Sequence, residues 1–270
     1  MNKSESSNIT TVFFSCVGRE HLLVKAIEGF EAHNQTSIRE CILAFDGPME
    51  RAFNPSQLAI DRLVNNCERQ GYVQSIRNAL ALINTDYFFW QEDDCFFLRD
   101  IEMERLKQEL ESNAHWVQVG WGIGTKFPDY EKTFPIGRDN MFRTAYGFSA
   151  RPSLCRTSDI RSAFATIGED EEISKAQGFE TWLREWLAKQ SKISVSLDPG
   201  DNPVYLHAGE IESTSRQYHC VGQGTGDVES YMASIDANRM PALSYRVKMI
   251  PKLAYSFISL CTQQLLDKGI

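Results

Sequence analysis

The first hundred residues of the chain alternate between two patterns of hydrophobic positions. Short runs rich in β-branched and aromatic residues have the composition and length of buried strands, and they occupy 10–17, 40–48 and 86–94. Segments with apolar residues at helical spacing lie between these runs, over 20–33, around 55–70 and over 75–85. Strands that alternate with helices in this way form a largely parallel sheet with helices on its faces. The pattern therefore predicts a doubly wound α/β fold.

The second half of the chain contains one strongly amphipathic segment followed by two short strands. Within 176–190, five apolar side chains share one helical stripe: Phe179, Trp182, Leu183, Trp186 and Leu187. Glu180 and Arg184 lie four residues apart on another face, where an exposed ion pair is the simplest interpretation. Residues 192–207 then predict a strand, a Pro/Gly turn and a second short strand that ends at His207. A lone histidine at a strand end is, by itself, no evidence for a ligand site.

Composition narrows the class of protein further. A length of 270 residues, of which 42% are hydrophobic, suits one large domain or two small ones. Seven cysteines without a CxxC pair indicate reduced thiols, and the opening MNKSESSNIT lacks the apolar stretch of a signal peptide. We therefore expect a protein of the cytoplasm or its membrane face. The formal net charge of −8 argues against broad nucleic-acid binding, so an anionic ligand would need local arginine residues or a metal ion.

Polar residues gather where the three predicted strands of the first half end. These strand ends are Cys16 to Arg19, Asp46-Gly47, and Glu92 to Asp94. Because ligands of parallel sheets bind at the carboxyl ends of the strands, we expect the three groups to line one site.

Three adjacent carboxylates occupy the last of these strand ends. Glu92, Asp93 and Asp94 repel one another unless a positive charge lies between them. A divalent cation would supply that charge, and oxygen ligands favour Mg²⁺ or Mn²⁺. Strand alternation would turn Glu92 and Asp94 to one side and Asp93 to the other. A solvated acidic turn that ends a strand is the alternative interpretation.

The order of these motifs resembles that of the GT-A glycosyltransferases, particularly the large inverting family 2. The stretch TVFFSCVGREHLLVKAIEGFEAHNQT is similar to the opening strand and helix of that family, with Arg19 in its arginine position. ILAFDGP is similar to the second strand, which ends in Asp-Gly at Asp46. SIRNALALINTDYFFWQEDD resembles the stretch in which an Arg-Asn pair, here Arg77 and Asn78, opens a helix and the next strand delivers a DxD motif.

The resemblance implies a GT-A fold, a mostly parallel nucleotide-binding sheet flanked by helices, with an acceptor-binding second half. It covers residues 1–100 well and extends more loosely to about 215. A single glycosyltransferase domain over 1–215 would then bind the nucleotide sugar with 1–100 and the acceptor with 101–215. Residues 216–270 would form a C-terminal helical extension.

The resemblance also implies roles for individual residues. In the family's DxD motif, Glu92 and Asp94 match the outer positions, and Glu92 departs from the usual aspartate. His207, in VYLHAG, fits the slot of a further metal ligand, so the predicted metal site is Glu92, Asp94 and His207, holding Mn²⁺ or Mg²⁺. The imidazole favours Mn²⁺. The predicted donor-binding residues are Cys16, Arg19, Asp46, Arg77 and Asp93, with Asp46 near the nucleotide base.

A carboxylate near the start of the acceptor helix serves as general base in the family, and Glu180 matches it. Asp170, in the acidic stretch IGEDEE, is the competing candidate. The resemblance thus implies transfer of a sugar from a nucleotide-diphosphate donor to a hydroxyl of a glycan or lipid-linked glycan, with inversion, in polysaccharide or glycoconjugate synthesis.

Other features of the second half have ordinary alternatives. Trp121 would stack on a sugar ring or belong to a buried strand, and three arginines would line an acceptor pocket or a surface loop: Arg143, Arg151 and Arg156. The apolar C-terminal stretch would lie on a membrane surface, pack against the domain or form a dimer interface.

Two other functions remain open at this level. A nucleotidyltransferase also combines carboxylates, metal and nucleotides, although SCVGRE is a poor version of its glycine-rich, basic phosphate loop. A non-catalytic sugar-binding or scaffold protein would keep the same fold without turnover.

Overall fold

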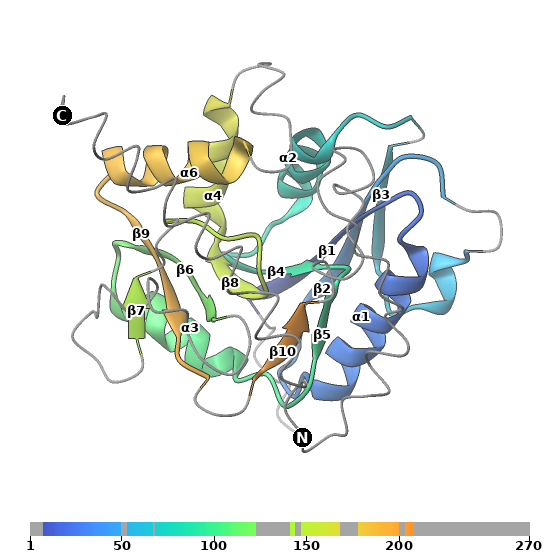
Figure 1. Cartoon of the computed structure of the whole chain (residues 1–270), viewed down its shortest axis with the longest axis horizontal. Helices are drawn as coiled ribbons and strands as arrows, with labels where there is room; N and C mark the ends of the chain where they lie inside the picture. The colour runs from blue at the N-terminus through green and yellow to red at the C-terminus, as the bar shows by residue number, and fades with distance from the viewer. Residues whose placement is uncertain are drawn as a thin grey trace, which may run out of the picture. The chain divides into compact units, whose positions relative to one another are not determined.

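The computed structural model describes residues 8–49, 53–66, 68–122, 141–143, 147–167, 178–199 and 203–207. Within these residues, one sheet of eight strands forms the centre of the molecule, in the order β3-β2-β1-β4-β8-β6-β9-β7 (Figure 1). Its strands are β1 (Ile9–Cys16), β2 (Glu40–Asp46), β3 (Arg62–Asn66), β4 (Tyr87–Glu92), β6 (Trp116–Trp121), β7 (Met141–Arg143), β8 (Ser153–Arg156) and β9 (Ile193–Leu197).

The sheet is mixed but mostly parallel. Strands β3, β2, β1 and β4 run parallel to one another, and β6 pairs with β9 in parallel. Strand β8 runs antiparallel between β4 and β6, and β7 runs antiparallel to β9 at the edge. The predicted α/β class with a mostly parallel sheet is therefore confirmed.

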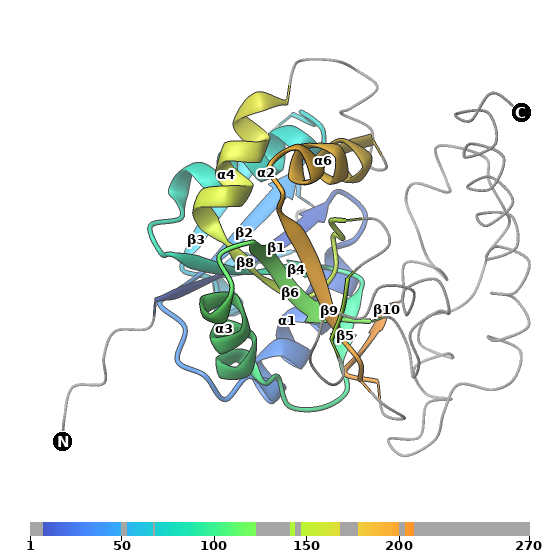
Figure 2. The ribbon, with the colours of Figure 1, turned by 90° about the vertical axis from the view of Figure 1, so that its left-hand side faces the viewer.

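Helices cover both faces of this sheet. They are α1 (Glu20–His33), α2 (Tyr72–Leu82), α3 (Met103–Ser112), α4 (Thr157–Thr166) and α6 (Gly178–Lys189). Two clusters of buried hydrophobic side chains lie on opposite faces of the sheet. The first cluster contains side chains of α1 and α3, and the second contains side chains of α2, α4 and α6. Figure 2 shows the two layers of helices on opposite sides of the strands.

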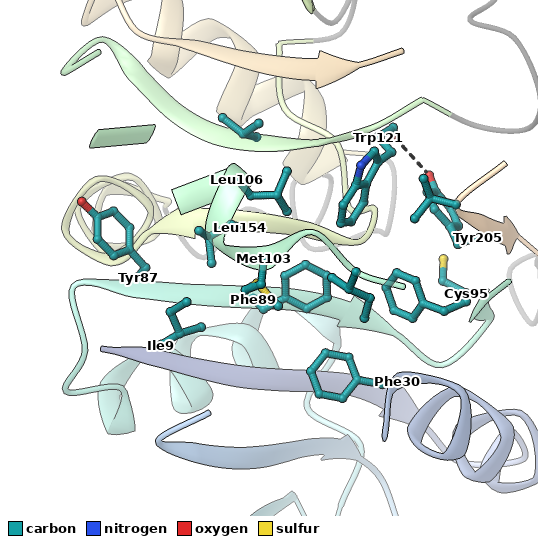
Figure 3. Close-up of a cluster of buried hydrophobic side chains, with 14 of the residues drawn as sticks. Ile9, Phe30, Tyr87, Phe89, Cys95, Met103, Leu106, Trp121, Leu154 and Tyr205 are labelled. Atoms are coloured by element: carbon teal, nitrogen blue, oxygen red, sulfur yellow. Dashed lines mark hydrogen bonds between the residues drawn. The ribbon is translucent and has the colours of Figure 1, made fainter. Parts of the chain in front are cut away.

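Strand alternation explains why there are two clusters. On β1, Phe13 enters the first cluster, whereas Val12 and Phe14 enter the second. On β4, Phe89 enters the first and Trp90 the second, and Figure 3 shows Phe89 in its cluster. Because both faces of these central strands are buried, their sequences are continuously apolar rather than alternating.

The predicted helix around 55–70 is wrong. This segment contains only a short 3-10 helix, η1 (Pro55–Gln57), before β3 extends the sheet from Arg62 to Asn66. Strand β3 pairs in parallel with β2, from Ile42 opposite Arg62 to Asp46 opposite Asn66. The apolar spacing of this segment resembles that of a helix, but pairing with the open edge of β2 determines its conformation.

A second, two-stranded sheet brings a distant segment to the end of β4. Its strands are β5 (Cys95–Phe97) and β10 (Tyr205–His207), which pair antiparallel with His207 opposite Cys95. The backbone N–H of Leu98 also donates to the carbonyl of Val204, at 2.9 Å. The predicted short strand that ends at His207 is therefore confirmed. It lies beside Glu92, Asp93 and Asp94, which we call the acidic turn.

No helix in the described ranges is long and apolar enough to span a bilayer. The predicted C-terminal extension over 216–270 and the alternative base Asp170 lie outside the described residues.

Candidate active site

The candidate site lies where the first strands of the sheet end. Strand β1 lies between β2 and β4, with Cys16 opposite Asp46 and Phe14 opposite Glu92. Because the three strands are parallel, this register brings the polar residues after β1, β2 and β4 together at the carboxyl ends of the strands, which we call the carboxyl edge of the sheet. The sequence predicted this meeting of strand ends, which the pairing confirms.

Arg19 supplies the positive charge between the acidic residues. Its Nη2 lies 2.8 Å from Asp93 Oδ1 and 2.7 Å from Asp94 Oδ2, with the arginine side chain only 12% exposed. Burial opposes the charge of the guanidinium, but Asp93 and Asp94 raise the pKa of Arg19 further above its ordinary value. The predicted donor-binding arginine is therefore a counter-ion of the acidic turn.

The predicted facing of the three carboxylates is wrong. Strand β4 ends at Glu92, so Asp93 and Asp94 form a turn in which side chains need not alternate. Both aspartates therefore reach Arg19, whereas Glu92 accepts a hydrogen bond from the hydroxyl of Tyr72. Burial and the charge of Asp94 raise the pKa of Glu92 well above its ordinary value. The three carboxylates therefore lie in two environments, with Asp93 and Asp94 beside Arg19 and Glu92 beside Tyr72.

Asp93 is held inside the site rather than exposed to a ligand. The Ser15 hydroxyl donates to Asp93 Oδ2 at 2.6 Å, and the Asp93 N–H donates to the Phe14 carbonyl at 3.2 Å. Burial raises the pKa of Asp93 to about 7, although Arg19 and Ser15 oppose this change. These contacts fix the turn against the end of β1.

Asp94 and His207 form the pair best suited to a metal ion. His207 Nε2 lies 3.5 Å from Asp94 Oδ1, and Cys95 Sγ belongs to the same group of ligand atoms, all within 4.8 Å of one another. Two ligands that each lie about 2.0–2.2 Å from one ion are separated by about 3–4 Å, which fits this pair. Burial alone would raise the pKa of Asp94, but His207 and Arg19 lower it well below the usual range.

Cys95 is the weaker member of that group. Burial and the neighbouring charges of Asp94 and Glu92 raise the pKa of its thiol well above the ordinary value. A protonated thiol is a poor ligand for a hard cation. A carboxylate and an imidazole, without a thiolate, match Mn²⁺ chemistry.

Glu180 lies in the first turn of α6, close enough to the acidic turn for its charge to influence Glu92. Its Oε1 accepts a hydrogen bond from the Ala150 N–H at 2.8 Å. Burial raises the pKa of Glu180, while Ala150, Arg151 and His207 oppose the change, and the Glu180 charge in turn raises the pKa of Glu92. The predicted base therefore lies within electrostatic reach of Glu92 and His207. A buried carboxylate with a raised pKa is suited to accept a proton near neutral pH.

Gly147 allows α6 to approach the segment that carries Ala150. Its φ is +78°, and a Cβ there would lie 2.7 Å from Arg184 Cγ and 3.1 Å from Arg184 Cα. We expect Gly147→Ala to lower the free energy of unfolding by about 2 kcal/mol, because it combines a left-handed backbone with overpacking. Urea unfolding measures this loss.

Gly29→Ala is the matched control for that experiment. A Cβ at Gly29, inside α1, would meet only ordinary contacts with Phe97, of which the shortest is 3.6 Å. Alanine in a helix interior should add about 0.5–1 kcal/mol. Equal stability of the two variants would contradict the close packing of Gly147 against Arg184.

The other predicted donor residues have defined structural partners. Asp46 Oδ1 accepts from the N–H of Gln70 at 2.8 Å, and Gly71 donates to both Asp46 oxygens. Arg77 donates to the carbonyls of Phe164 and Ile167 at the end of α4. Cys16 is half-buried and accepts the Arg19 N–H through its carbonyl, at 3.2 Å. Asp46 thus orders the loop that leads into α2, and Arg77 ties α2 to α4.

Two candidates for the acceptor pocket lie elsewhere. Trp121 is 3% exposed and belongs to the first hydrophobic cluster, where Tyr205 donates to its carbonyl (Figure 3). Arg156 pairs in register with Tyr87, at the start of β4. It therefore lies at the amino end of β4, whereas the candidate site lies at the carboxyl end. The buried-strand interpretation of Trp121 is therefore confirmed and its sugar-stacking alternative is wrong, and Arg156 does not line the candidate site. The structure does not describe the side chain of Arg143. Arg151 lies close enough to Glu180 for its charge to lower the pKa of that carboxylate.

Three residues that contact the acidic turn are not among the predicted site residues: Ser15, Tyr72 and Cys95. Ser15 directly precedes the predicted loop at Cys16, and Cys95 directly follows Asp94. Their positions next to predicted site residues in the sequence could have indicated that they belong to the site. Tyr72 has no such signal, because its contact with Glu92 depends on how α2 packs on the sheet.

Two solved structures share the fold of this chain. The structure of residues 1–349 of S. aureus TarS aligns with a TM-score of 0.53 at 12% identity, over 74% of this chain and 61% of that chain. The structure of GalNAc-T7 with UDP, GalNAc and Mn²⁺ aligns with a TM-score of 0.51 at 9% identity, over 70% of this chain and 42% of that chain. This chain therefore spans less than two thirds of either chain.

The likeness shows that this chain has a GT-A-type fold. No protein-family model matches the sequence, and neither does any curated protein.

Proposed function

We propose that the protein is a metal-dependent glycosyltransferase. It would transfer a sugar from a nucleotide-diphosphate donor to an acceptor hydroxyl, with inversion at the anomeric carbon. The observation that carries the proposal is the pairing of Asp94 with His207, 3.5 Å apart, at the carboxyl edge of the sheet. GalNAc-T7, a structure of similar fold that holds UDP and Mn²⁺, supports this choice of donor and metal.

Asp94 and His207 would hold the metal ion, with Glu92 beside them. When bound, Mn²⁺ or Mg²⁺ would neutralise the donor diphosphate and the charge that develops on the leaving group. Asp94 suits this role because the permanently charged Arg19 lowers its pKa and favours the carboxylate, while His207 would bind the ion as a neutral imidazole. Arg19 and Ser15 would keep the turn rigid, because together they hold Asp93 and Asp94.

Glu180 would act as general base. Its carboxylate would take the proton from the acceptor hydroxyl as that oxygen attacks the sugar. The hydrogen bond from Ala150 orients one carboxylate oxygen and leaves the other for the acceptor. An inverting transfer needs a base on the acceptor side, and no covalent intermediate with the enzyme.

The loop from Cys16 to Arg19 and the end of β2 at Asp46 would bind the nucleoside, since they share the carboxyl edge with the acidic turn. Arg77 and Asp93 would contribute through the elements they hold in position. The acceptor would be a glycan or lipid-linked glycan, bound by 101–215 in the cytoplasm or at its membrane face.

Binding of nucleotide diphosphates tests the proposal. The full chain is titrated with UDP, GDP, TDP and CDP, with and without Mn²⁺, by isothermal titration calorimetry. We expect one nucleotide to bind at least about tenfold more tightly with Mn²⁺, because the ion offsets repulsion between the acidic turn and the diphosphate. If none of the four binds with or without the metal, the proposed function is refuted.

A further inference from the structure

The two oxygens of the Asp94 carboxylate face two different groups. Oδ2 lies 2.7 Å from Arg19 Nη2, and Oδ1 lies 3.5 Å from His207 Nε2. A cation held by Asp94 and His207 would therefore share this carboxylate with a guanidinium that never loses its charge at ordinary pH. Arg19 is thus a permanent competitor for the negative charge of the proposed metal ligand.

The backbone of Arg19 is held in place on both sides. Gly18 adopts a φ of +82°, and the Arg19 N–H donates to the Cys16 carbonyl at 3.2 Å. The Arg19 carbonyl accepts the N–H groups of Leu22 and Leu23, both at 3.0 Å, at the start of α1. Arg19 is therefore anchored at the loop between β1 and α1, beside the carboxyl ends of the strands.

The guanidinium has donors that the aspartates do not use. Both ion pairs, to Asp93 and to Asp94, engage the same nitrogen, Nη2. Arg19 Nε is buried, and among the described residues it has no hydrogen-bond acceptor. A planar guanidinium with spare N–H groups is the side chain best suited to bind phosphate oxygens.

We propose that Arg19 sets the affinities for the two ligands of this site in opposite directions, weakening the binding of a divalent cation alone and strengthening the binding of the donor diphosphate. The proposal rests on the proposed function. The guanidinium repels a second cation on the same carboxylate and attracts the negative diphosphate. Cation and nucleotide would therefore bind the site together, and the cation alone would bind weakly. Arg19 is a positioning residue for Asp94 and a specificity residue for the diphosphate.

Replacing Arg19 by methionine tests this inference. Methionine keeps much of the length and apolar contact of the side chain but removes its charge. We expect Arg19→Met to bind Mn²⁺ alone about tenfold more tightly, and to bind the nucleotide diphosphate at saturating Mn²⁺ at least about tenfold more weakly. Electron paramagnetic resonance of free Mn²⁺ measures the first affinity, and calorimetry measures the second.

Two further variants complete the experiment. Arg105→Met, at a half-exposed arginine of α3 that pairs with Glu102, is the matched control and should leave both affinities unchanged. Arg19→Lys keeps the charge but loses the planar fork, so the Mn²⁺ affinity should stay within about twofold while the nucleotide affinity falls. It also serves as the test if Arg19→Met does not fold, which circular dichroism would reveal.

The outcomes separate this inference from the proposed function. If the wild-type protein binds neither Mn²⁺ nor any nucleotide diphosphate, both proposals are overturned. If the wild type binds both ligands but Arg19→Met weakens both or changes neither, Arg19 is only a structural clamp of the turn and this inference alone is overturned. If Arg19→Lys, used because Arg19→Met does not fold, loses Mn²⁺ affinity, the inference is overturned in the same way.

Discussion

Replacement of Asp94 by asparagine should abolish metal-dependent binding of the nucleotide diphosphate, with a loss of at least about hundredfold in affinity. Asparagine keeps the size of the side chain but removes the charge that faces both His207 and Arg19. A neutral amide oxygen is a much weaker ligand for Mn²⁺ than a carboxylate. Titration with Mn²⁺ and the nucleotide that binds the wild type measures the loss.

Asp100→Asn is the matched control for this experiment. The Asp100 side chain is 67% exposed and lies 3.5 Å from His33, away from the acidic turn. This variant should bind Mn²⁺ and nucleotide as the wild type does. If Asp94→Asn remains folded and also binds both ligands normally, the metal site does not include Asp94 and the role of the Asp94–His207 pair is refuted.

The strands that carry the site could be predicted from the sequence because their signals are local. The runs that became β1, β2 and β4 are short, apolar and rich in β-branched and aromatic residues, and each stops at a polar residue or a turn. Because both of their faces are buried, no alternation was needed to recognise them. Their parallel pairing then fixes which polar residues meet at one edge.

The position of His207 could also be predicted, but only in part. The Pro/Gly turn before it indicated a short strand that ends at this residue. The antiparallel pairing that puts His207 opposite Cys95 joins residues more than a hundred positions apart, and no local pattern specifies such a partner. The family resemblance supplied the expected contact with Asp94, and the sheet pairing provides its physical cause.

The charge balance of the acidic turn could not be predicted from residue spacing. The sequence predicted that a cation separates the carboxylates, whereas Arg19 already lies between Asp93 and Asp94. This contact depends on the left-handed Gly18 and on the register of β1 with β4, which are properties of the folded chain. The same limitation explains why β3 was mistaken for a helix, since its partner strand decides its conformation.

The replacement Glu180→Gln should separate catalysis from binding. We expect turnover of the nucleotide sugar whose diphosphate binds to fall by about 10²–10⁴-fold, because glutamine cannot accept the acceptor proton. Donor affinity should change by less than about twofold, since the amide oxygen can still accept the Ala150 N–H and Glu180 is not a proposed metal ligand. Release of the nucleotide diphosphate measures turnover, and calorimetry measures binding.

The pH dependence of turnover provides a second test of the same base. Only the ionised carboxylate accepts a proton, so kcat/KM should fall as pH decreases through the pKa of Glu180, which burial raises above its ordinary value. This acid limb should be absent from the residual activity of Glu180→Gln. Glu185→Gln, at an exposed position of the same helix, is the matched control and should keep both the rate and the limb.

The two measurements together decide between an enzyme and a binding protein of this fold. Loss of turnover with intact donor binding in Glu180→Gln, while Glu185→Gln stays active, supports a transferase in which Glu180 is the base. A wild-type protein that binds the donor without turnover in the presence of varied glycan acceptors would instead indicate a sugar-binding protein. If Glu180→Gln keeps full activity, the base lies elsewhere, and Asp170 becomes the residue to replace next, because it is the other acidic candidate in the sequence.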